Sequence, residues 1–209
     1  MSATPVLSLL ETRVLGVLVE KQHTVPDSYP LTLNALVSGS NQKTSRDPVI
    51  EASEGEVQAA IDRLKSLSMV MESSGGRVMR YAQNAGKVLG VPPQSVALLT
   101  VLFLRGPQTA GELRINAERL HKFGDILAVE GFLNELAERG MVRELAKQPG
   151  ARETRWVHLL SGEPATTPSA PASHTDAIVG VSELEALKAR IDALEATVAR
   201  LCRELGVTP

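Results

Sequence analysis

Cationic side chains at two places in the first half of the chain could bind phosphate groups. Lys43 and Arg46 stand in a polar segment before a predicted helix, and Arg77 and Arg80 stand in a predicted hairpin. Lysine and arginine hold nucleic acids mainly by the phosphate backbone, and amide side chains add hydrogen bonds. The sequence therefore predicts a DNA-binding face made of eight residues: Asn41, Gln42, Lys43, Arg46, Arg63, Lys65, Arg77 and Arg80.

Other chemistries lack the residues that they need. The histidines are scattered at four positions, and a single cysteine excludes a disulfide framework or a cysteine-rich zinc site. The sequence has no glycine-rich phosphate loop between a strand and a helix, and no Gly-x-Ser-x-Gly elbow. Its carboxylates are mixed with Lys and Arg, the usual pattern of solvated helix faces. We predict a protein that is not an enzyme and that holds no metal and no cofactor.

The overall charge restricts the partners. The chain carries 22 Lys and Arg against 24 Asp and Glu, a formal net charge of -2, which excludes a generally basic nucleic-acid coat protein but leaves room for a local basic face. Aromatic residues make up 3%, too few for the stacking platforms that bind single strands. We find no apolar run long enough to span a bilayer and no signal-peptide pattern, so we expect a cytoplasmic protein with no membrane partner.

The elements that must position these residues form a repeated pattern. Ser/Thr-x-x-Glu capping boxes predict helix starts at Ser8, Ser53, Thr109 and Ser182. In the first half, hydrophobic periodicity predicts helices over 9–21, 31–37 and 54–67 and strands over 69–72 and 77–82. In the second half it predicts helices over 94–105, 110–120 and 126–139 and strands over 141–145 and 154–160. Three helices followed by a hairpin is the order of a winged-helix domain.

An internal repeat supports two such domains. An offset of 72 residues relates five apolar positions, Val57, Ile61, Leu64, Met69 and Val70, to Val129, Leu133, Leu136, Met141 and Val142. This offset is too long for a solenoid and fits a duplicated small domain. We predict a mainly α fold with small β-hairpins (α+β), with tandem winged-helix domains over 1–89 and 90–160. A different small α+β unit is the alternative.

The last part of the chain differs in composition. Residues 161–181 are rich in Pro, Ala, Ser and Thr and predict a flexible linker. Residues 182–206 carry an apolar seam spaced alternately by three and four: Leu184, Leu187, Ile191, Leu194, Val198, Leu201 and Leu205. The seam is typical of a parallel two-stranded coiled coil, so we predict a homodimer through residues 183–205. A helix that packs on its own domain is the alternative.

One segment points to a family. The stretch 29–49, and above all Asn41-Gln-Lys-Thr-Ser-Arg-Asp-Pro-Val49, resembles the signature of the YceH family of bacterial proteins. Segments 9–21 and 109–114 are similar to the family as well, and the resemblance covers residues 6–160. Ser40 and Thr44 stand where the family pattern has Cys and Ser. The resemblance implies tandem winged helices and no established activity.

Two functions remain open. The first is a DNA-binding, transcription-regulator-like protein in which the first domain contacts duplex DNA. Against it, the third helix of that domain begins with Glu54 and Glu56, and the matching helix of the second domain carries Glu130, Glu135 and Glu138. The second is a non-enzymatic adaptor whose winged helices bind a protein partner.

Overall fold

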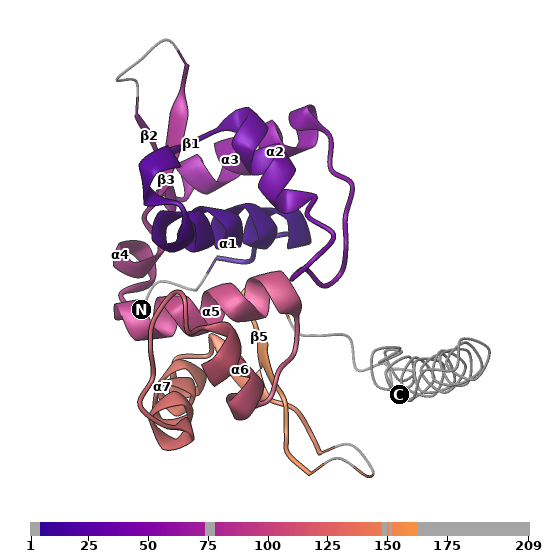
Figure 1. The fold of residues 1–209 in the computed structure, drawn as a ribbon, viewed down its shortest axis with the longest axis vertical. Helices are drawn as coiled ribbons and strands as arrows, with labels where there is room; N and C mark the ends of the chain where they lie inside the picture. The colour runs from indigo at the N-terminus through magenta and orange to yellow at the C-terminus, as the bar shows by residue number, and fades with distance from the viewer. Residues whose placement is uncertain (1–4, 74–77, 148–149, 151, 163–209) are drawn as a thin grey trace, which may run out of the picture. The chain divides into compact units, whose positions relative to one another are not determined.

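The computed structural model describes residues 5–73, 78–147, 150 and 152–162. These residues belong to one compact unit, Met1–Pro164. They form helices together with two small antiparallel sheets, which confirms the α+β class (Figure 1). The predicted coiled coil at 182–206, and all but the first two residues of the predicted linker at 161–181, lie outside the described residues.

The first half is a helical layer with a three-stranded sheet at one side. Strand order is β1-β3-β2, with Leu31 of β1 and Glu72 of β2 on either side of Tyr81 of β3. The elements follow the chain as α1 (Leu9–Thr24), a 3-10 turn (Pro26–Ser28), β1 (Leu31–Thr32), α2 (Leu33–Ser40), α3 (Glu54–Ser66), β2 (Val70–Ser73) and β3 (Arg80–Gln83).

The second half repeats this order with a smaller sheet. Strands β4 and β5 pair antiparallel. Gln108, on the segment between the helices 93–105 and 110–116, forms an isolated bridge with Trp156 of β5. The elements are α4 (Ala85–Leu89), α5 (Pro93–Arg105), α6 (Ala110–Asn116), α7 (Ile126–Glu138), β4 (Val142–Glu144) and β5 (Trp156–His158).

The predicted helix starts follow from local hydrogen bonds. At Ser8, the hydroxyl accepts from the Glu11 amide at 3.2 Å while the Glu11 carboxylate accepts from the Ser8 amide at 2.9 Å. The same reciprocal pairs occur at Ser53 and Thr109, so these three capping boxes are confirmed. The fourth, at Ser182, lies outside the described residues.

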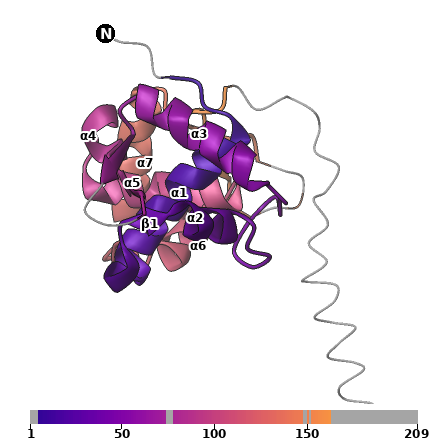
Figure 2. The same ribbon diagram turned by 90° about the horizontal axis from the view of Figure 1, so that it is seen from above.

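A single hydrophobic core joins the two halves. Helix α1 lies between the other helices of the first half and α5 (Figure 1), and seen from above α3 crosses over it (Figure 2). Helix α1 is buried continuously from Thr12 to Val19. The helices approach closely, because a Cβ built on Gly16 would lie 2.9 Å from Cδ2 of Leu104. All ten apolar positions related by the 72-residue offset are buried.

The structure departs from the predicted elements at several bounds: α2 runs on to Ser40, and β5 covers only Trp156–His158 of the predicted 154–160. Helix α1 continues to Thr24, and α6 ends at Asn116. Leu31 belongs to β1 because Thr32 caps α2, which leaves Leu31 to pair with Tyr81. Helix α4 was not predicted, since a helix of five residues is too short to show a period.

Candidate functional site

Arg46, a residue of the predicted DNA-binding face, is buried inside the first half. Its side chain has no solvent exposure, and Nη2 lies 2.7 Å from Oε2 of Glu20 on α1. The guanidinium also donates to the Gly39 carbonyl at 3.2 Å and to the Gln42 side chain at 2.6 Å. We correct the prediction for Arg46: a guanidinium with these internal partners is not free to bind a phosphate.

The two amide side chains of the predicted face also hold the loop that precedes α3. Asn41 donates to the Ala52 carbonyl and accepts from the Ala52 amide, both at 2.8 Å. Gln42 accepts from Arg46 and from Lys21, the latter at 3.5 Å. These contacts close the segment between α2 and α3, where the predicted face places base-contacting groups.

Arg13 holds the same loop from the other side, a role that the sequence analysis missed. It is fully buried on α1 and donates to the Ser40 carbonyl at 3.2 Å and the Pro48 carbonyl at 2.6 Å. Burial, and then the nearby charge of Arg46, lower the pKa of the Arg13 guanidinium. An arginine within an apolar helical run was the available signal.

Of the five other cations of the predicted face, the four that the structure describes differ in their surroundings. Lys43 and Arg63 are exposed, whereas Lys65 pairs with Glu72 and lies 3.6 Å from Asp62. Arg80 donates to backbone carbonyls of the 28–30 segment at 3.1 and 2.7 Å. Arg77 lies outside the described residues.

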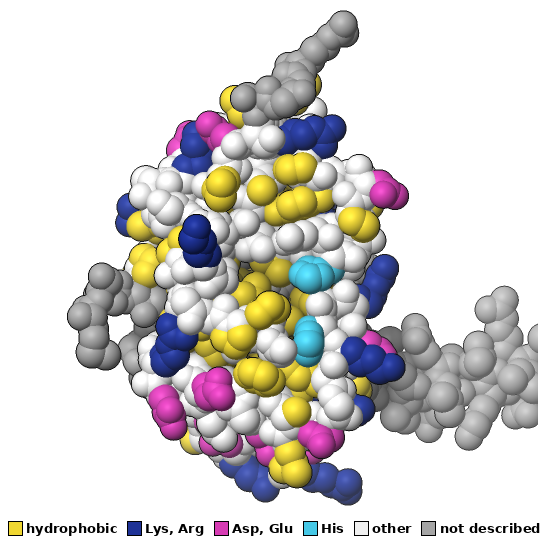
Figure 3. Space-filling model, turned by 90° about the vertical axis from the view of Figure 1, so that its left-hand side faces the viewer, with side chains coloured by type: hydrophobic (Ala, Val, Ile, Leu, Met, Phe, Trp, Pro, Cys, Tyr) yellow, Lys and Arg dark blue, Asp and Glu magenta, His cyan; other side chains and the backbone are white. Residues whose placement is uncertain are grey.

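One face of the molecule shows how the charges are spread (Figure 3). Hydrophobic side chains gather in a hollow near its centre, beside histidine side chains, and Lys and Arg side chains stand singly around them. This face therefore has no continuous basic patch among the described residues of the kind that phosphate binding requires.

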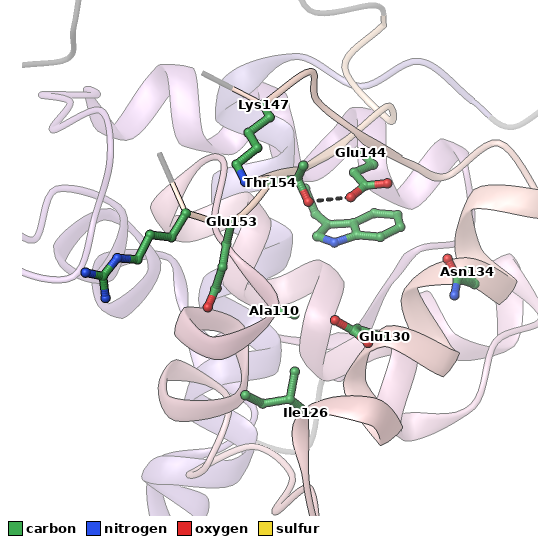
Figure 4. Close-up of a pocket in the computed structure, with 10 residues that line it drawn as sticks. Ala110, Ile126, Glu130, Asn134, Glu144, Lys147, Glu153 and Thr154 are labelled. Atoms are coloured by element: carbon green, nitrogen blue, oxygen red, sulfur yellow. Dashed lines mark hydrogen bonds between the residues drawn. The ribbon is translucent and has the colours of Figure 1, made fainter. Parts of the chain in front are cut away.

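A cleft of about 450 Å³ lies between α7 and the β4–β5 hairpin (Figure 4). The start of α6 closes one end at Ala110, and the buried Trp156 of β5 also lines it. The charged lining residues carry both signs: Glu130, Glu144 and Glu153, with Lys147 and Arg152. Of these charged residues, only Glu130 stands out in the sequence, as part of an acidic helix.

The acidic groups of the cleft differ in their partners. The Thr154 hydroxyl donates to Glu144 within the hairpin. Glu130 and Glu153 make no hydrogen bond or ion pair with any other described residue. Their carboxylates are therefore available to a ligand.

Large apolar side chains are exposed on the two helices beside the cleft. Leu127 is 75% exposed and Ile126 43% exposed, both in the first turn of α7, and Ile115 near the end of α6 is 70% exposed. Single exposed aliphatic side chains are ordinary on a protein surface, but Ile126 also lines the cleft and Leu127 is its neighbour in the chain. The first turn of α7 therefore presents apolar groups next to a cleft lined by charges of both signs.

His158 of β5 is half-buried. Its ring packs edge-on against Phe103 with centroids 4.9 Å apart, and its Nδ1 has no hydrogen-bond partner among the described residues. Burial lowers the pKa of His158 to about 4.

Within the described ranges no three His, Cys, Asp or Glu side chains gather as metal ligands, and no helix could cross a membrane.

Comparison with known proteins identifies the family. A family model described as "Protein of unknown function, DUF480" matches residues 7–151. The chain belongs to the DUF480 family. The resemblance of residues 29–49 to the YceH family is thereby confirmed, since these names describe the same group.

Relatives of this chain carry the name UPF0502. One from Dechloromonas aromatica is 59% identical over 202 residues, which cover 95% of this chain and 94% of the relative. Another, from Methylibium petroleiphilum, is 57% identical over 200 residues, 94% of this chain and 86% of the relative. Neither name states an activity, so function rests on the geometry.

Proposed function

We propose that this DUF480 protein is a non-enzymatic adaptor whose tandem winged-helix domains bind a protein partner. One observation carries the proposal: the surface between α7 and the β4–β5 hairpin presents exposed Ile126 and Leu127 beside the carboxylates of Glu130 and Glu153.

The order of the elements supports the winged-helix arrangement. In the first half, α1, β1, α2, α3, β2 and β3 follow one another and the sheet order is β1-β3-β2. In the second half, Gln108 pairs with Trp156 at the place where the first half has β1. In a winged helix the third helix and the hairpin flank the bound nucleic acid, so α7 and the β4–β5 hairpin are the matching pair here.

The chemistry of this pair favours a protein over DNA. A phosphate backbone entering the cleft would meet three carboxylates, Glu130, Glu144 and Glu153, whose repulsion offsets the attraction of Lys147 and Arg152. Leu127 would gain nothing from phosphates, but burying an aliphatic side chain contributes favourably to protein association. In the first half, the ion pair of Arg46 with Glu20 removes a central cation of the expected DNA face.

Dimerisation belongs to the same proposal. The heptad seam at 183–205 lies outside the described residues, and its spacing favours two parallel strands. A homodimer would present two copies of the α7 surface, which raises the apparent affinity for a partner with two binding segments.

Co-purification with a tagged full-length chain tests the adaptor. We expect the wild type to retain a partner in stoichiometric amount and Leu127→Ser to lose it. Val88→Ser is the matched control, because Val88 is also an exposed aliphatic residue, 38% exposed, but lies on α4. Equal recovery of the partner with Leu127→Ser and wild type would contradict the proposal.

Duplex DNA is the second candidate ligand, favoured by exposed Lys43 and Arg63 around α3. Binding to labelled duplex at several salt concentrations tests it. For a DNA-binding protein, the logarithm of the association constant falls linearly with the logarithm of the salt concentration. The double substitution Lys43→Ala and Arg63→Ala would make this slope less steep. If the slope is steep and depends on these two residues, DNA is the ligand of the first half.

A further inference from the structure

We infer that the cleft between α7 and the β4–β5 hairpin binds a basic segment of a partner protein, one that carries an aliphatic side chain beside a lysine or arginine. This inference rests on the proposed adaptor function, because it names the chemistry of the partner.

The carboxylates supply the first half of the recognition. Glu130 comes from α7 and Glu153 from the hairpin, and in Figure 4 their carboxylates lie on either side of Ala110. Oε2 of Glu153 also lies 3.8 Å from the position of a Cβ built on Gly111, which places this carboxylate over the start of α6. Two unpaired carboxylates on opposite walls suit a cationic side chain between them.

The apolar groups supply the second half. Ile126 lines the cleft itself, and Leu127 follows it with most of its surface exposed. Trp156 lines the same cleft from β5 and is itself buried. An aliphatic side chain next to the basic residue of the partner would cover Ile126 and Leu127 and remove their apolar surface from water.

The charges on the two walls of the cleft determine how the partner segment is oriented in it. The charged residues within α7 are all acidic, namely Glu130, Glu135 and Glu138. Lys147 and Arg152 stand on the hairpin side, so the cleft is not uniformly negative. A partner therefore places its basic side chain towards α7 and Glu153, and its backbone carbonyls or an acidic residue towards Lys147 and Arg152.

Three short synthetic peptides test the chemistry against the full-length chain by fluorescence anisotropy. One alternates lysine with leucine, one alternates glutamate with leucine, and one alternates lysine with serine. We expect the lysine–leucine peptide to bind about tenfold more tightly than either of the others, and more weakly as salt rises. Equal binding of the glutamate–leucine peptide would overturn the inference.

Isosteric variants locate the binding. Glu130→Gln with Glu153→Gln removes two charges and should weaken the lysine–leucine peptide about fivefold. Glu51→Gln with Glu54→Gln changes the net charge equally at exposed sites of the first half, and should leave binding unchanged. Equal weakening by both pairs would show general charge attraction and overturn the site.

The outcomes also separate this inference from the proposed function. If Leu127→Ser abolishes co-purification of a partner but the lysine–leucine peptide does not bind, the adaptor function is supported and the inference of a basic partner segment is wrong. If labelled duplex DNA, with no peptide present, binds the wild type and loses that binding in Lys147→Ala with Arg152→Ala, the cleft prefers phosphates and the inference is wrong.

Discussion

Arg46 is held by four residues inside the fold, since it donates to Gly39, Gln42 and the Ser45 carbonyl as well as to Glu20. Such a network fixes the loop between α2 and α3 in one conformation. The loop also reaches the second half, because the Asp47 amide donates to the Leu104 carbonyl at 2.8 Å and Arg105 donates to the Ser45 hydroxyl at 2.8 Å.

Removing Arg46 should therefore destabilise the fold. We expect Arg46→Ala to lower the free energy of unfolding by about 3 kcal/mol, because it leaves the half-buried Glu20 carboxylate without its partner. Denaturant unfolding measures the change. Lys43→Ala, at an exposed site in the same loop, should stay within about 0.5 kcal/mol of wild type. Equal effects of the two variants would mean that Arg46 is not part of a buried network.

His158 should make stability depend on pH. Its pKa is about 4 in the folded chain, against 6.5 as the ordinary value, so the unfolded chain binds more protons between these limits. Stability from the neutral ring is complete above pH 6.5 and declines as the pH falls towards 4. His158→Leu should flatten this dependence in unfolding curves measured from pH 7 to pH 4.5. An unchanged slope would show that His158 titrates normally.

At the scale of elements, the contact between α1 and α5 joins the two halves. A Cβ on Gly16 would come within 2.9 Å of Leu104, and the surrounding core is filled. We expect Gly16→Ala to cost about 1–3 kcal/mol of unfolding free energy, since overpacking forces side chains to shift.

A second glycine gives the matched control. A Cβ on Gly131, within α7, would meet nothing within 4 Å. Gly131→Ala should stabilise the chain by about 0.5–1 kcal/mol through helix propensity alone. Thermal or denaturant unfolding compares the two variants. If both substitutions changed the unfolding free energy in the same direction, the close approach of α1 to α5 would not determine the effect of Gly16→Ala.

The elements were predictable where their signals are local. Capping boxes marked the starts of α1, α3 and α6. The apolar positions of α3 recur in α7 at an offset of 72 residues, which marked both helices. The burial of Arg46 was not predictable, because its partner Glu20 lies 26 positions away and no sequence pattern links them. The cleft was not predictable either, since it combines α6, α7 and the hairpin. The exposed Leu127 beside it looks like an ordinary helical residue in sequence.

At the scale of the whole molecule, the C-terminal heptads determine whether two chains associate and thus whether one particle carries one or two α7 surfaces. We expect the full chain to sediment as a dimer whose dissociation depends on concentration, because the seam extends over only about three heptads. Leu187→Ser with Leu194→Ser should yield monomers in analytical ultracentrifugation. A dimer that survives both substitutions would place the association elsewhere.

Photo-cross-linking from position 127 in living cells tests the adaptor most directly. A photoreactive amino acid replaces Leu127 in one chain and Val88 in a control chain, both exposed aliphatic sites. We expect one discrete protein adduct from position 127, lost when Glu130→Lys is added, and none from position 88. DNA adducts without a protein adduct at position 127, or identical protein adducts from both positions, would contradict a partner-binding surface on α7.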